Sequence, residues 1–164
     1  MRQLQHIVAS LAMLLIVVGL SACSGEDCPI NNVVLAKMGF HSSYGDAVEF
    51  NGILTVSAVR PQGDSVVLNQ GYNTSEVLFP LSYTHETDTF VLCYVNNFGT
   101  AYDSLYVSHT NTPTLVSVAC GTAMFHTITS VRSTHHVIDS LILKSPEVNY
   151  DERENIQVIY RTAD

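Results

Sequence analysis

Four residues in the last third of the chain have side chains that could support catalysis or bind a metal ion. His126, His135, His136 and Asp139 lie within 14 residues of sequence and carry the nitrogen and oxygen donors that zinc binds. Successive side chains of a strand point to opposite faces, so His136 and Asp139 would diverge on one. No His-x-His pair is present. The spacing therefore predicts no metal site, and a metal-dependent or enzymatic role for these four residues is an alternative hypothesis.

Two of these residues also invite other interpretations. Asp139 stands in an apolar run, and a carboxylate in such a run needs hydrogen-bond partners, which favours a structural role. Cys120 and His126 could be paired as a nucleophile and its base, but the residues around Cys120 match no catalytic motif. A disulfide explains Cys120 better.

Familiar catalytic and nucleotide-binding motifs are missing from the sequence. It contains no Gly-x-Ser-x-Gly elbow, no His-Glu-x-x-His helix and no Gly-x-x-x-x-Gly-Lys loop. The acidic stretch at Asn149, Asp151, Glu152 and Glu154 lacks the glycine and the final glutamate of a calcium-binding hand, so we expect a solvated loop. We therefore predict no catalytic residue, no cofactor and no nucleotide.

The modification that the sequence favours is acylation of Cys23. Arg2 and His6 precede an uncharged apolar run over residues 7–20, as in an export signal. As a helix this run would reach only about 21 Å, which is short of the ~30 Å hydrocarbon core of a membrane. The motif Leu20-Ser21-Ala22-Cys23 resembles the lipobox of bacterial lipoproteins. The resemblance implies a signal peptide over residues 1–22, cleavage between Ala22 and Cys23, and a diacylglycerol and palmitate anchor on Cys23.

The residues after Cys23 bear on the compartment. In enteric-type lipoproteins an Asp directly after the lipidated Cys retains the protein at the inner membrane, whereas Ser24 stands here. We expect the outer membrane, with the periplasmic and cell-surface faces both open, and a lipidated tether over residues 23–31. The whole chain has a net charge of −8, and removal of residues 1–22 leaves six basic and fifteen acidic residues, a net charge of −9. This acidity argues against nucleic acid as a partner, and the lipid on Cys23 would make the membrane contact.

Three further cysteines, Cys28, Cys93 and Cys120, allow three disulfide pairings in an oxidising compartment. Cys93 lies in a run that is apolar on both faces, residues 90–95, and is expected to be a buried thiol. The pairing of Cys28 with Cys120 is therefore favoured, and it would attach the tether to the domain.

Alternating apolar residues and regularly spaced turns organise residues 32–164 as a single domain. Period-2 strands are predicted over residues 34–40, 54–58, 65–69, 77–81, 89–95, 104–109, 114–120, 124–131, 137–143 and 156–161. Residues 71–73 are predicted to turn, and Asn111 with Pro113 is predicted to form another turn. Pro80 indicates an edge or a strand end, and residues 89–95 a sheet centre. The fold class is all-β, a two-layer antiparallel β-sandwich of about nine or ten strands with immunoglobulin-like or transthyretin-like connectivity.

A series of motifs resembles a family of uncharacterised Bacteroidota lipoproteins, described only as a domain of unknown function. The motifs are Asp27-Cys28-Pro29-Ile30-Asn31-Asn32, Phe79-Pro80-Leu81, the segment at Asp88-Thr89, Val118-Ala119-Cys120-Gly121, Thr134-His135-His136-Val137-Ile138-Asp139-Ser140 and Glu154-Asn155-Ile156-Gln157-Val158-Ile159-Tyr160. Ala119 departs from the pattern, where an acid is expected. The resemblance implies a lipoprotein, its compartment, its fold and the pairing of Cys28 with Cys120. It implies nothing about mechanism.

These observations lead to one expected function and two alternatives. We expect a non-enzymatic accessory or binding subunit of the cell envelope, anchored to the outer membrane, that engages another envelope protein through a sheet face or edge. The first alternative is the enzyme or metal-dependent binder described above. The second is a glycan-binding module using Tyr72, Tyr83 or Tyr106, which would require two or more coplanar rings on one surface.

Overall fold

The computed structural model describes residue 28 and residues 32–161, and strands dominate this part of the chain. Alternation of apolar and polar residues accounts for most of them, because one side of each strand is buried and the other faces solvent. The strands are β1 (Leu35–His41), β2 (Phe50–Ala58), β3 (Ser65–Thr74), β4 (Glu76–Pro80), β5 (Thr87–Asn96), β6 (Gly99–Ser117), β7 (Gly121–Ser133), β8 (Ile138–Leu143), β9 (Glu147–Val148) and β10 (Ile156–Tyr160).

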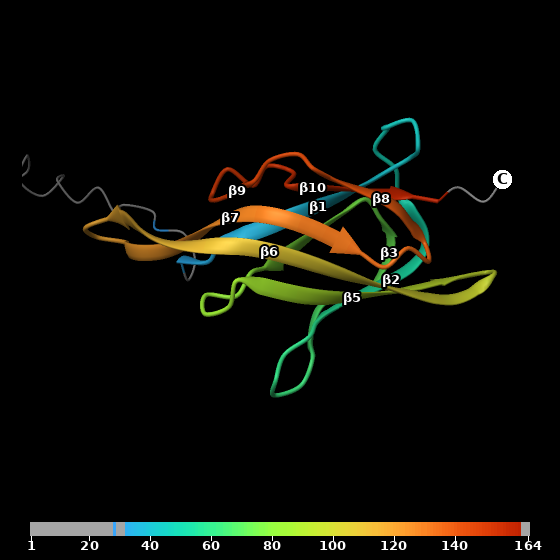
Figure 1. The fold of residues 1–164 in the computed structure, drawn as a ribbon, viewed down its shortest axis with the longest axis horizontal. Helices are drawn as coiled ribbons and strands as arrows, with labels where there is room; N and C mark the ends of the chain where they lie inside the picture. The colour runs from blue at the N-terminus through green and yellow to red at the C-terminus, as the bar shows by residue number, and fades with distance from the viewer. Residues whose placement is uncertain (1–27, 29–31, 162–164) are drawn as a thin grey trace, which may run out of the picture.

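The strands form two sheets that pack face to face (Figure 1). The smaller sheet has the order β4-β1-β10-β8, and the larger has the order β3-β2-β5-β6-β7-β9. All described pairings are antiparallel except that of β1 with β10. This confirms the predicted β-sandwich of about ten strands. The parallel pair was not predicted, and the immunoglobulin-like or transthyretin-like connectivity stays a prediction.

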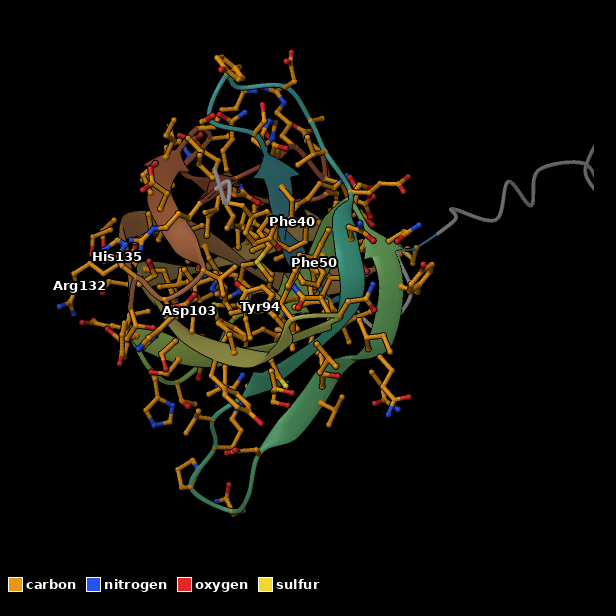
Figure 2. The ribbon with its side chains drawn as sticks, turned by 90° about the vertical axis from the view of Figure 1, so that its right-hand side faces the viewer. Phe40, Phe50, Tyr94, Asp103, Arg132 and His135 are labelled. Carbon is orange, nitrogen blue, oxygen red and sulfur yellow. A yellow bond between two sulfur atoms is a disulfide. The ribbon has the colours of Figure 1, made fainter. Side chains whose placement is uncertain are left out.

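The core lies between the two sheets. On β5 the side chains of Phe90, Leu92 and Tyr94 point inward and are buried, while the alternate residues face solvent. β5 lies between β2 and β6, as predicted for a central strand. Cys93 is on the outward side of β5 and is only half-buried, so the expectation of a buried thiol was wrong. The run over residues 90–95 is apolar on both faces, but only its alternate positions point into the core. Figure 2 shows the inward side chains filling the space between the sheets.

β6 is a single strand of 19 residues, and it corrects the predicted turn at Asn111 and Pro113. Pro113 pairs with Met124 of β7 and interrupts neither strand. β5 begins at Thr87, which lies opposite Ser108, so the second half of β6 has β7 as its sheet neighbour and an open edge on the other side. A proline is tolerated on an open edge, because the missing amide hydrogen breaks no sheet hydrogen bond there.

β3 corrects the second predicted turn, since residues 71–73 lie within the strand. The pairing of β2 with β3 shifts register between Leu54 and Val56, and Gln70 and Asn73 have φ angles of 52° and 49°. These are the features of bulges, in which extra residues bend a strand without ending it. Turn-forming residues therefore mark a distorted strand here.

A disulfide joins Cys28 to Cys120 at the tip of the β6–β7 hairpin, which is the pairing that was favoured. Nδ2 of Asn32 donates to the carbonyl oxygen of Cys120 at 2.7 Å and adds a second contact at the same tip. The predicted signal peptide, the cleavage site at Ala22 and Cys23, and nearly all of the tether lie outside the described residues. Among the described residues, none belongs to a helix of the length and hydrophobicity needed to span a membrane.

Candidate functional site

A cavity of about 510 Å³ opens at the end of the sandwich farthest from the disulfide, and we call it the distal cleft. β6 runs from one end of the sandwich to the other (Figure 1). Asn97 and Phe98, in the turn before it, line the cleft, and its last residue, Ser117, is near Cys120. At ~3.3 Å per residue this strand covers about 60 Å. The lining residues are Glu49, Phe50, Asn51, Gly52, Ile53, Tyr72, Val95, Asn96, Asn97, Phe98, Val137, Tyr160 and Arg161.

Two aromatic rings stand at the rim of the distal cleft with little cover. Phe98 is 97% exposed and Tyr72 is 70% exposed. Phe98 occupies the β5–β6 hairpin turn, where its amide donates to Oδ1 of Asn96 at 2.9 Å. A turn of this kind favours small polar residues, so an exposed phenylalanine gains nothing for folding. Exposed aromatic side chains beside a cavity are typical of a ligand-binding surface.

Gly52 shapes one wall of the distal cleft. Its φ angle is +152°, and a Cβ at this position would lie 2.5 Å from the carbonyl oxygen of Val95 and 2.9 Å from the ring of Phe50. Only glycine therefore permits β2 to approach β5 this closely. The close approach brings Ile53 and Val95 opposite each other on the cleft wall.

The floor of the distal cleft is an aromatic cluster. Tyr160 packs against Phe40, Phe50 and Tyr94 with ring centroids 5.1, 5.4 and 5.8 Å apart. Burial raises the pKa of both Tyr94 and Tyr160, so both stay neutral. Their hydroxyls are close enough to affect each other's pKa, but neither meets the geometry of a hydrogen bond with any described residue. The two buried hydroxyls beneath the cleft are therefore each other's nearest polar neighbours.

Asp103 of β6 is a buried carboxylate near this cluster (Figure 2). It bonds to the segment of residues 134–138, which includes Val137 in the wall of the cleft. Its oxygens accept hydrogen bonds from the hydroxyl of Thr134 at 2.7 Å and from the amides of His136, Val137 and Ile138 at 2.8, 2.8 and 3.0 Å. Burial alone would raise the pKa of Asp103, but these hydrogen bonds outweigh it and hold the pKa below its ordinary value. Asp103 thereby positions Val137, whose carbonyl accepts from the amide of Arg161 at 2.9 Å.

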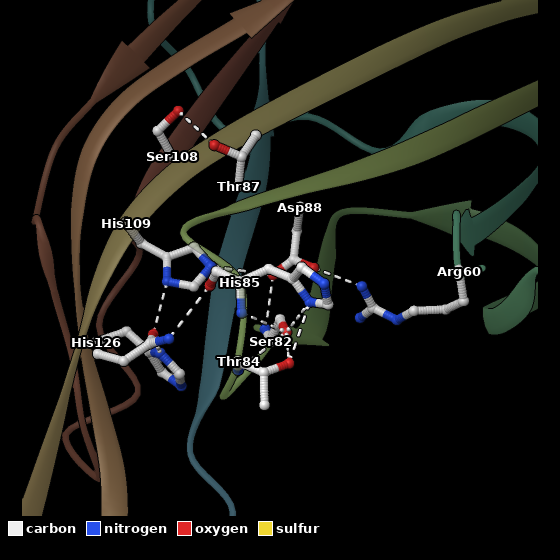
Figure 3. A network of polar contacts seen from close by, with 10 residues as sticks. Arg60, Ser82, Thr84, His85, Thr87, Asp88, Ser108, His109 and His126 are labelled. Atoms are coloured by element: carbon white, nitrogen blue, oxygen red, sulfur yellow. Dashed lines mark hydrogen bonds and ion pairs between the residues drawn. The ribbon is translucent and has the colours of Figure 1, made fainter. Parts of the chain in front are cut away.

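A second buried carboxylate, Asp88 of β5, organises a polar network partway along the sandwich (Figure 3). Asp88 accepts a hydrogen bond from the guanidinium of Arg60 and another from the amide of Ser82 at 2.6 Å. Nε2 of His109 lies 3.1 Å from Oδ2 of the same carboxylate, and both side chains are almost fully buried. The carboxylate is therefore surrounded by donors, as a buried charge requires.

Asn111 connects His109 to His126. Its Nδ2 donates to the carbonyl oxygen of His85 at 3.2 Å, which orients Oδ1 toward both rings. Oδ1 lies 2.9 Å from Nδ1 of His109 and 2.7 Å from Nδ1 of His126, and an amide oxygen only accepts. Both histidines therefore carry a proton on Nδ1. Nε2 of His109 lies beside the carboxylate of Asp88, so both ring nitrogens of His109 face oxygen atoms.

His126 is neutral at pH 7. Burial, together with the electrostatic interaction with the neighbouring His109 ring, lowers the pKa of His126 to about 4. Tyr83 stacks on the ring with centroids 5.8 Å apart and covers it. Nε2 of His126 is buried and has no hydrogen-bond partner among the described residues.

The polar network contains serine, histidine and aspartate, but they are not arranged as a nucleophilic triad. Oγ of Ser82 lies 3.0 Å from Nδ1 of His85, and it also accepts from the amides of Thr84 and His85. Asp88 accepts a hydrogen bond from the amide of Ser82 and bonds the ring of His109, which is a different histidine from the one beside Oγ of Ser82. The serine thus stabilises the turn before β5, and the network stabilises the fold.

The four residues considered as metal ligands lie in different surroundings. His126 belongs to the buried network, and His136 contacts Asp103 with Nδ1 at 3.3 Å. His135 and Asp139 line a separate pocket of about 390 Å³ beside Arg132. Over the part of the chain that the structure describes, no three His, Cys, Asp or Glu side chains gather as metal ligands. Asp139 faces outward on β8, so the expectation that its carboxylate needs hydrogen-bond partners was wrong. The buried carboxylate bonded to backbone amides is that of Asp103.

The three tyrosines of the glycan hypothesis also occupy different places. Tyr72 lines the distal cleft, Tyr83 stacks on His126, and Tyr106 lies beneath the guanidinium of Arg132 at 5.6 Å. The aromatic companion of Tyr72 at the cleft is Phe98, which the sequence reasoning did not select. Asp88, Asp103 and His109 were also missed, although each alternates with apolar residues that point into the core.

Comparison with known proteins places the chain in a family. The model of the family of unknown function DUF6452 matches residues 53–160, which is well over half of the chain. The chain belongs to this family. The matched segment runs from Ile53 to Tyr160, both at the distal cleft, and it includes Asp88, Asp103 and the histidines of the network. Searches of curated proteins and of solved structures each found no significant match.

Proposed function

We propose that this member of the family is an outer-membrane lipoprotein anchored through the acylated Cys23. The uncharged run over residues 7–20 and the lipobox-like motif that ends at Cys23 support this proposal. The acyl chains implied by the motif would hold the protein to the bilayer, since each buried CH₂ contributes ~0.8 kcal/mol. The Cys28–Cys120 disulfide then attaches the tether to the β6–β7 tip.

The proposed role is that of a non-enzymatic binding subunit that holds another envelope protein in the distal cleft. The observation that carries this proposal is the pair of exposed rings, Phe98 and Tyr72, beside a cavity with an aromatic floor. A partner segment with an apolar side chain fits such a cavity, and Glu49 and Arg161 at its edge offer one charge of each sign. The cleft also lies at the far end of β6 from the tether, where a partner has free access.

A glycan is the second candidate ligand, because sugars stack on aromatic rings and bond to amides. Tyr72 and Phe98 supply the rings, and Asn96 and Asn97 supply amide groups on the same cleft. A partner protein and a glycan give different products in the experiment below.

Site-specific photocrosslinking in the native outer membrane tests the binding role. A photoreactive residue at Phe98 is expected to capture one discrete protein species after irradiation. The matched control carries the same residue at Gln62, which is exposed in the turn after β2, the end of that strand remote from Phe50 and the cleft. Substitution of Tyr72 with Ala in the Phe98 protein is expected to reduce the yield several-fold.

The outcomes separate the two ligands. Capture of a protein from Phe98, and not from Gln62, supports the partner-binding role. A product that carries sugar and no second polypeptide supports the glycan role. Equal products from Phe98 and Gln62 would count against the distal cleft as the site.

A further inference from the structure

We infer that the tip of the β6–β7 hairpin, through Leu115 and Val118, inserts into the lipid surface beside the anchor. The inference rests on the proposed anchoring through Cys23 and adds a second membrane contact made by the folded domain. Two contacts, the lipid and the hairpin tip, would fix the orientation of the domain relative to the membrane, whereas the lipid alone would not.

The first observation is the exposure of apolar side chains at this tip. Val118 is 97% exposed and Leu115 is 66% exposed, and both lie within five residues of Cys120. Neither contributes to the core, which ends on β7 at Ala123 in this direction. Apolar side chains at the tip of a hairpin are unfavourable in water and favourable at the boundary between head groups and acyl chains.

The second observation is the charge distribution. No Asp, Glu, Lys or Arg occurs from Ser104 to Val131, which covers the whole hairpin beyond the centre of β6. The rest of the chain carries all of its charged residues, with a net charge of −8. Entry of a charged side chain into lipid is costly, and acidic residues are also repelled by anionic head groups. The hairpin therefore carries no Asp, Glu, Lys or Arg side chain toward its tip, although the protein as a whole is acidic.

The third observation is the position of the disulfide. Cys120 lies at the tip, and Cys28 bonded to it begins the described chain. Cys23 is five residues before Cys28, so the lipidated residue is at most about 18 Å from Cys28. Glu26 and Asp27 fall in that span, outside the described residues. The disulfide places the Cα of Cys28 5.3 Å from that of Cys120 at the tip. The anchor therefore delivers the tip to the lipid surface.

A tryptophan reporter tests the inference directly, because the chain contains no Trp. Ala119→Trp places the reporter at the exposed tip, and Phe98→Trp places the same reporter at the opposite end as a matched control. The full-length, lipidated protein is reconstituted into phosphatidylethanolamine and phosphatidylglycerol vesicles with brominated or unbrominated acyl chains. We expect brominated lipid to reduce the fluorescence of Ala119→Trp at least two-fold and to leave that of Phe98→Trp unchanged.

A double substitution separates the tip from the anchor. Leu115→Asp with Val118→Asp, in the Ala119→Trp protein, is expected to abolish the quenching while the protein still floats with the vesicles. Unchanged urea midpoints are expected, since both side chains are exposed.

Each remaining outcome would overturn the inference. Flotation without quenching at residue 119, equal quenching at residues 98 and 119, or quenching that survives the double substitution refutes the tip contact and leaves the lipid anchor intact. A protein that does not float with the vesicles refutes the anchoring itself, and the tip contact with it.

Discussion

Oδ2 of Asp103 lies 2.8 Å from the amide nitrogen of Val137, so a buried carboxylate on β6 holds a residue that lines the distal cleft. Asp103→Asn replaces one acceptor oxygen with an amide donor that faces other donors. We expect the free energy of unfolding to fall by about 3 kcal/mol, because backbone amides lose their acceptor. Urea unfolding measures it. Asp139→Asn on β8, which faces solvent, is the control and should change stability by less than ~0.5 kcal/mol.

The same carboxylate predicts a pH dependence. The pKa of Asp103 is lower in the folded state than in the unfolded chain, so the folded state binds its proton less readily. Its stabilising contribution is therefore complete above the unfolded pKa of ~3.9 and is lost as the pH falls through the folded pKa below it. Between about pH 5 and pH 2 the wild-type protein should lose more stability than Asp103→Asn. Identical slopes would show that Asp103 does not titrate in this way.

His126 predicts a separate loss of stability at a higher pH. Its pKa is about 4 in the folded protein and ~6.5 in the unfolded chain, so between these values the unfolded state binds the extra proton. Stability should be complete above about pH 6.5 and decrease as the pH falls toward 4, by up to about 3 kcal/mol. In His126→Asn this part of the pH dependence should disappear. Nitrogen NMR of the wild-type ring should show a proton on Nδ1 and none on Nε2 at pH 6.

Gly52 and Gly63 distinguish a steric clash from backbone strain. Both have positive φ angles, +152° and +116°, but an added Cβ meets the Val95 carbonyl at 2.5 Å only at Gly52 and meets nothing within 4 Å at Gly63. Gly63→Ala should cost about 1 kcal/mol, the effect of the φ angle alone. Gly52→Ala should cost about 2–4 kcal/mol, because β2 must move away from β5. Equal losses in thermal or urea unfolding would contradict the close approach.

Reduction of the Cys28–Cys120 disulfide should destabilise the domain. The bond spans 92 residues, for which the loss of chain entropy in the unfolded state is worth at most about 4–5 kcal/mol. Cys28→Ser with Cys120→Ser should lower the free energy of unfolding by about 2–4 kcal/mol and make it insensitive to reductant. Cys93→Ser, which removes the free thiol, should leave both the stability and the response to reductant unchanged.

Strand alternation carries more information about the site than the motifs do. Leu105 and Val107 are inward residues of β6, so Asp103 and His109, two positions before and after them, must also point inward. By the same rule Asp88 shares the inward face of β5 with Phe90. The period-2 pattern that predicted the strands therefore also identifies these buried polar residues, once it is continued to the next inward position of β5 and β6. Clustering of histidines along the sequence does not identify them.

Other features depend on contacts that the sequence does not reveal. Pro113 is compatible with a strand because β5 extends no further than Thr87, opposite Ser108, and leaves the edge of β6 at Pro113 open. The exposure of Phe98 depends on the tight turn before Gly99 and on the absence of any covering segment there among the described residues. The parallel pairing of β1 with β10 joins strands more than a hundred residues apart, and local patterns cannot specify it.

The length of β6 has a mechanical consequence. A partner that pulls on the distal cleft, against a tether bound at Cys120, loads the protein along the axis of β6. The hydrogen bonds that join β6 to β5 and β7 are perpendicular to this axis, so the force shears many of them together and does not unzip them one by one. If the proposed binding role and anchor hold, this arrangement would resist a pull between the distal cleft and the membrane.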